Sequence, residues 1–73
     1  MNWDIVAGNW KEFKGLVLMQ WGKLTDDQLD LIAGKKTYLA GEIQKAYGLS
    51  KEEVETQIKH FEELNKHYKS AEK

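Results

Sequence analysis

Two stretches decide the fold of this chain: WGKLTDDQ at residues 21–28 and YGLSKEE at residues 47–53. In each, an aromatic residue and a glycine precede a leucine, a hydroxyl residue and acidic residues. A left-handed glycine ends many helices, so we expect Gly22 to take that conformation. A Ser or Thr followed three residues later by Glu or Gln begins many helices. The two stretches therefore predict helix starts at Thr25 and Ser50.

Both stretches belong to an internal repeat of 26 residues, and the first copy comprises Ala7-Gly8, Phe13, Gly15 and Trp21-Gly22. It returns as Ala33-Gly34, Leu39, Gly41 and Tyr47-Gly48. Each copy predicts a short helix, a glycine break or turn near Gly8 or Gly34, and a longer helix. A closing helix is expected from about Lys51 to about Ser70. We therefore expect an all-α array of four to five helices, two α-hairpins with approximate internal duplication. A three-helix bundle that tolerates the glycines is the alternative.

Apolar residues at helical spacing predict the core. In the first segment they recur at steps of three or four and include all three tryptophans: Trp3, Val6, Trp10, Phe13, Val17 and Trp21. The second segment offers Leu29, Ile32, Leu39, Ile43 and Tyr47, and the closing helix offers Val54, Ile58, Phe61, Leu64, Asn65 and Tyr68. A chain this short buries only about 60 to 65% of its unfolded surface. We therefore expect the indole rings to be core material and not a ligand platform.

Composition narrows the class of protein. The 73 residues predict one domain, 1–73, with 70–73 expected to fray. There is no cysteine, so neither a disulfide nor a thiolate metal site can form, and no cofactor is expected.

Eleven basic and twelve acidic residues give a formal charge of −1, which argues against nucleic acid as a partner. No signal peptide is visible and the longest apolar run, LVLM at residues 16–19, is too short to cross a bilayer. We expect a soluble cytoplasmic protein without membrane contact.

Four strings in the chain resemble the CsbD-like family of small bacterial proteins: WKEFKG at 10–15, QWGKLTDD at 20–27, LDLIAGK at 29–35 and YGLSKEE at 47–53. The resemblance extends from Trp3 to about Phe61. It implies a small helical protein with an approximately duplicated array, associated with general stress responses. The family has no established biochemical activity, so the resemblance supplies no catalytic or ligand-binding residues.

One departure from the family pattern offers a candidate partner surface. The family usually has lysine and glutamate after Gly15, whereas this chain has the LVLM run. On a helical wheel only Val17 joins the tryptophan stripe, so Leu16, Leu18 and Met19 lie off it. Neighbouring helices could bury these three side chains, or the three could form an exposed patch for a protein partner or a second copy of the chain.

The remaining candidate sites are weaker. Lys35 and Lys36 follow a glycine turn at a helix start, where backbone N–H groups can hold a phosphate, although a solvated connecting turn explains them as well. His60, Glu63 and His67 share a helix side without the spacing of a metal site, so we expect surface histidines and no metal.

The hydroxyl residues are expected to be helix caps, and adjacent acidic residues diverge by about 100° on a helix. No catalytic residues are therefore predicted. Together with the stress association that the resemblance implies, this gives the hypothesis of a non-enzymatic bacterial general stress-response protein of unknown biochemical activity. The alternatives are an interaction or self-association module using Leu16, Leu18 and Met19, and a weak nucleic-acid binder using the Gly34-Lys35-Lys36 turn.

Overall fold

The computed structural model describes residues 1–66, and within that range all regular structure is helical. The helices are α1 (Trp3–Gly8), α2 (Trp10–Gln20), α3 (Asp26–Ile32), α4 (Lys36–Tyr47) and α5 (Lys51–Leu64). The predicted all-α array is confirmed, with a short and a longer helix in each copy of the repeat and α5 closing the chain. The three-helix alternative is wrong because α1 ends at Gly8 and the chain turns at Gly34.

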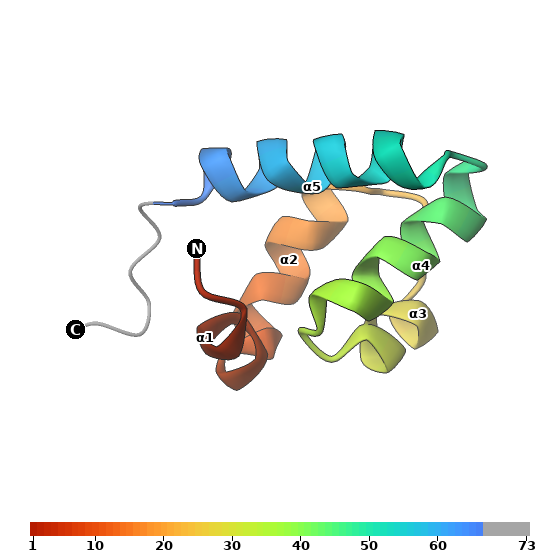
Figure 1. Cartoon of the computed structure of the whole chain (residues 1–73). Coiled ribbons are helices and arrows are strands. Elements are labelled where there is room, and N and C mark those ends of the chain that lie inside the picture. The colour runs from red at the N-terminus through yellow and green to blue at the C-terminus, as the bar shows by residue number, and fades with distance from the viewer. Residues whose placement is uncertain (67–73) are drawn as a thin grey trace.

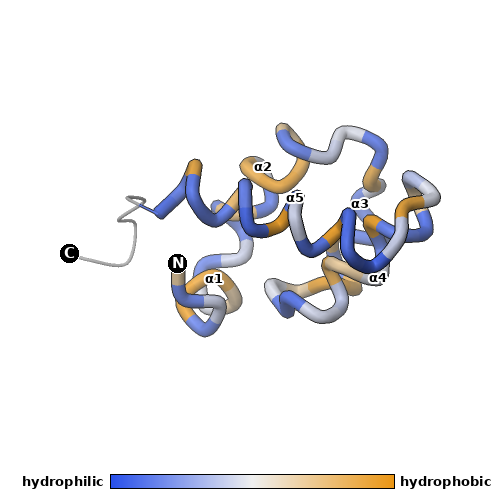
Figure 2. Tube along the Cα trace, turned by 45° about the horizontal axis from the view of Figure 1, so that its top comes forward, coloured by the Kyte–Doolittle hydropathy of each residue, from blue (hydrophilic) through white to orange (hydrophobic). Residues whose placement is uncertain are grey.

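The helices form two pairs covered by α5. In Figure 1, α5 lies across the top, and the two longer helices α2 and α4 both run up toward it from the opposite side, where α1 and α3 lie. Hydrophobic and hydrophilic residues alternate along α5, as an amphipathic covering helix requires (Figure 2). Equivalent parts of the two copies therefore approach the same closing helix.

The core draws on every helix. Its buried side chains are all apolar: Val6, Phe13, Val17, Trp21, Leu24, Leu29, Ile32, Leu39, Ile43, Val54, Ile58 and Phe61. Trp3 and Trp10 are half-buried and pack against this core. The tryptophan stripe therefore faces the interior, with Trp21 the most deeply buried of its three indoles.

Both predicted helix starts are capping boxes. The Thr25 hydroxyl oxygen accepts the Gln28 backbone N–H at 3.2 Å, while the Gln28 side-chain oxygen accepts the Thr25 N–H at 2.9 Å. Ser50 and Glu53 make the same reciprocal pair at 3.1 and 2.9 Å. Each box satisfies two backbone donors that the helix itself leaves unpaired.

The expected left-handed Gly22 is wrong. Among residues 1–66, positive φ occurs only at Ala33, Gly34 and Gly48. The chain leaves α2 one residue before Gly22, at Trp21, whose backbone is no longer helical (φ −129°, ψ 78°) although its N–H still donates to the Val17 carbonyl at 2.8 Å. The helix thus ends where the indole turns into the core, so no left-handed residue is needed there.

The closing helix is shorter than expected. It ends at Leu64, not near Ser70, and the Asn65 side chain donates to the Phe61 carbonyl at 2.9 Å. Leu64 is 63% exposed, so its predicted core position is wrong. At 100° per residue it lies roughly a quarter turn from the stripe centred on Val54, Ile58 and Phe61. The expectations for Tyr68 and for fraying at 70–73 lie outside the described residues.

Candidate functional site

The three indole N–H groups each join distant parts of the chain. The bonds are Trp3 Nε1 to Glu62 Oε2 at 2.7 Å, Trp10 Nε1 to the Leu29 carbonyl at 2.9 Å, and Trp21 Nε1 to Gln57 Oε1 at 2.8 Å. A buried or half-buried tryptophan normally finds such an acceptor. These rings therefore fasten the first repeat to α3 and α5, and the polar ends of the indoles are occupied by structural contacts.

Glu62 is the meeting point of three segments. Its carboxylate accepts the Trp3 indole N–H and also pairs with Lys36 Nζ at 3.2 Å, joining α1 and α4 to α5. Burial on its own raises the pKa of the Glu62 carboxyl, but the hydrogen bonds from Trp3 and Lys36, with nearby positive charge, outweigh it. The net pKa lies below the ordinary value for a glutamate.

The candidate patch at the end of α2 is divided. Leu16 is half-buried and packs against the core, whereas Leu18 is 40% and Met19 84% exposed. The run that contains them is the continuous hydrophobic stretch near the end of α2 in Figure 2. Only Leu18 and Met19 are thus open for contact with a partner.

The two lysines of the glycine turn lie next to groups of their own chain. Lys36 Nζ pairs with Glu62, and Lys35 Nζ lies 5.7 Å from the centre of the Tyr38 ring. Lys35 is the N-cap of α4 and makes no side-chain capping bond. A phosphate at this turn would compete with the Glu62 carboxylate for Lys36, which counts against a nucleic-acid interface here.

The histidine and acidic candidates do not converge. Residues 1–66 contain no group of three or more metal-ligating side chains placed to hold an ion. Glu63 instead pairs with Lys66 at 3.3 Å on the helix surface. His60 is exposed, and His67 lies outside the described residues.

A groove of about 650 Å³ lies between the start of α4 and α5. Its lining residues mix both charges: Lys36, Lys51, Lys59, Glu52, Glu55 and Glu62, with Thr37 and Thr56 beside them and Ala40 and Ile58 at the apolar part. Because three lysines and three glutamates line it, the groove favours neither anions nor cations.

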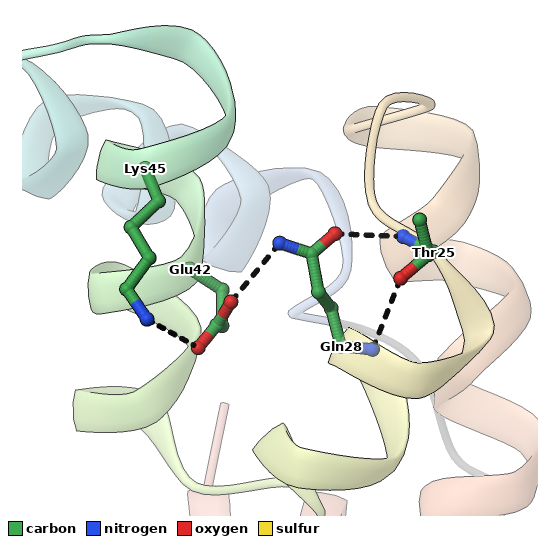
Figure 3. A network of polar contacts seen from close by, with 4 residues as sticks. All are labelled: Thr25, Gln28, Glu42 and Lys45. Atoms are coloured by element: carbon green, nitrogen blue, oxygen red, sulfur yellow. Dashed lines mark hydrogen bonds and ion pairs between the residues drawn. The ribbon is translucent and has the colours of Figure 1, made fainter.

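A network of polar contacts joins α3 and α4 (Figure 3), and the sequence alone does not predict it. The Gln28 side-chain N–H donates to Glu42 Oε1 at 3.0 Å, and Glu42 Oε2 pairs with Lys45 at 3.4 Å. Gln28 therefore uses its oxygen to cap α3 and its nitrogen to hold α4. The cap is readable from local spacing, but the contact with Glu42 depends on the tertiary fold.

The chain is similar in sequence to a known protein family and to several bacterial proteins. The sequence model for CsbD-like proteins matches residues 4–56. UPF0337 protein ECA0631 of Pectobacterium atrosepticum is 52% identical over 68 residues, covering 93% of this chain and 99% of the relative. UPF0337 protein YjbJ is 48% identical in Escherichia coli K12 (92% of this chain, 97% of the relative) and in Salmonella typhimurium (89% and 93%). No solved structure matches the chain significantly. With a family match over most of its length and relatives aligned nearly end to end, the chain belongs to the CsbD-like family.

Proposed function

We propose that this chain is a non-enzymatic general stress-response protein acting in the bacterial cytoplasm. Its membership of the CsbD-like family supports the association with stress. The observation that favours a non-enzymatic role is the use of its polar side chains. Thr25 and Ser50 are helix caps, and Gln57 and Glu62 accept indole N–H groups. These two hydroxyls and the Glu62 carboxylate are thus engaged in helix capping and in a contact between helices.

Deletion of the gene tests this proposal. We expect the protein to accumulate on osmotic, acid, heat or starvation stress, and the deletion strain to survive at least one of them less well than its parent. A plasmid copy should restore survival. Unchanged protein levels and equal survival under all four stresses would contradict the proposed role.

A second candidate function is self-association through the exposed end of α2. It is favoured by the exposure of Leu18 and Met19 beside the half-buried Leu16. Sedimentation velocity from micromolar to millimolar concentration should then show association that Leu18→Lys abolishes. Leu31→Lys on α3 is the matched control, since Leu31 is 66% exposed. A monomer at every concentration would exclude self-association.

Within residues 1–66, no helix has the length and hydrophobicity needed to cross a bilayer.

A further inference from the structure

The acceptors of the three indole N–H groups differ in how they respond to acid. Trp10 bonds a backbone carbonyl and Trp21 bonds the amide oxygen of Gln57, and both acceptors are neutral at every relevant pH. Trp3 alone bonds a carboxylate, that of Glu62. Hydrogen bonds to an ionised acceptor are the stronger kind, and protonation removes that advantage. Acid therefore weakens one of the three indole contacts selectively.

The weakened contact is one of those that hold α1, beside the packing of Ala7 against Gly34. This helix has six residues, too few to be stable in isolation, and it joins α2 through the single residue Asn9. It depends on Val6, which is fully buried, and on the Trp3 ring, whose centre lies 6.4 Å from that of Phe61. The hydrogen bond from the Trp3 indole to Glu62 connects α1 to α5.

Two positive groups act on the Glu62 carboxylate. Lys36 faces it from α4 at 3.2 Å, and the amino group of Met1 adds positive charge from the segment before α1. On α5 itself, Lys59 and Glu55 line the same groove. The pKa of Glu62 is lower in the fold than in the unfolded chain, so the contact is complete at neutral pH and is lost as pH falls through the folded-state pKa.

We propose that Trp3, Glu62 and Lys36 form an acid-released latch, which holds α1 on α5 at neutral pH and frees α1 when the carboxylate is protonated. The proton removes the charge that attracts Lys36 and weakens the acceptor of the Trp3 N–H. Release of α1 uncovers the part of Phe61 that faces the Trp3 ring. The latch is independent of the proposed stress role.

Nuclear magnetic resonance tests the latch directly, because each indole N–H of the ¹⁵N-labelled full chain gives its own signal. Trp-to-Phe variants assign the signals. From pH 7 to about 2.5, the Trp3 indole and the α1 amides should shift together, with a midpoint below the ordinary glutamate value. The Trp10 and Trp21 signals should stay in place until global unfolding. Movement of all three indoles at one midpoint, or no titration at Trp3, would overturn the proposal.

Glu62→Gln and Glu63→Gln form a matched pair for hydrogen exchange. Glu62→Gln keeps a hydrogen-bond acceptor at this position but removes its charge. Glu63→Gln removes the charge of the neighbouring, exposed carboxylate that pairs with Lys66. At pH 7, Glu62→Gln should speed α1 amide exchange by about tenfold, spare α4 and α5, and abolish the Trp3 titration. Glu63→Gln should change neither. Equal acceleration in all helices, or wild-type exchange in Glu62→Gln, would refute a latch.

Discussion

Gly34 shows how one residue fixes the contact between the two repeats. It is buried with φ +80°, and a Cβ placed on it would lie 2.5 Å from the Ala7 Cα and 2.9 Å from the Ala7 nitrogen. Ala7 belongs to the first copy of the repeated Ala-Gly pair and Gly34 to the second. The backbones of the two copies therefore meet at a point where a side chain has no room.

Replacement of Gly34 by alanine should destabilise the fold strongly. The left-handed backbone costs about 1 to 2 kcal/mol and the clash with Ala7 about 1 to 3 kcal/mol more. Urea denaturation measures the sum of these two costs as a decrease in the free energy of unfolding. Gly48→Ala is the control, because Gly48 has φ +65° but open space around its Cβ position, so only the first cost applies. Equal losses in the two variants would show that the close approach to Ala7 has no energetic weight.

Helix α3 illustrates what a local signal contributes to an element. It spans only seven residues, yet its first turn is completed by the reciprocal bonds of Thr25 and Gln28. Thr25→Ala should lower the free energy of unfolding by about 1 kcal/mol. Thr25→Ser should keep most of this stabilisation, because serine also caps a helix. Thr56→Ala, at an exposed hydroxyl inside α5, should stay within about 0.5 kcal/mol of wild type. A similar loss at Thr56 would mean that the capping geometry is not the cause.

Individual helices also show which features the sequence predicts correctly and which it does not. Capping boxes and the turn at Gly34 depend on neighbours within a few residues, so spacing alone predicts them. The prediction of a left-handed Gly22 fails because the burial of Trp21 redirects the chain before the glycine is reached. The Trp3 contact with Glu62 spans 59 positions and has no local signature. Likewise, helical spacing placed Leu16, Leu18 and Met19 off the stripe, but only packing decides which of them is exposed.

At the scale of the whole molecule, α5 packs against both repeats. Phe61 is fully buried, and its ring centre lies 5.1 Å from that of Trp21 and 6.4 Å from that of Trp3. The ring thus touches both ends of the first repeat, while Ile58, also on α5, belongs to the same core cluster as Leu39 and Ile43 of α4. Phe61 belongs to this cluster too, so loss of its ring should weaken the contacts of both repeats together.

Phe61→Ala should therefore cost about 3 to 5 kcal/mol, a large share of the total stability of a domain this small. Circular dichroism reports all helices and tryptophan fluorescence reports mainly the first repeat, so the two urea transitions should shift together and coincide. Leu64→Ala on the same helix should change stability by no more than about 0.5 kcal/mol, because Leu64 is largely exposed. If fluorescence changed at lower urea than circular dichroism in Phe61→Ala, the repeats would unfold separately and α5 would not couple them.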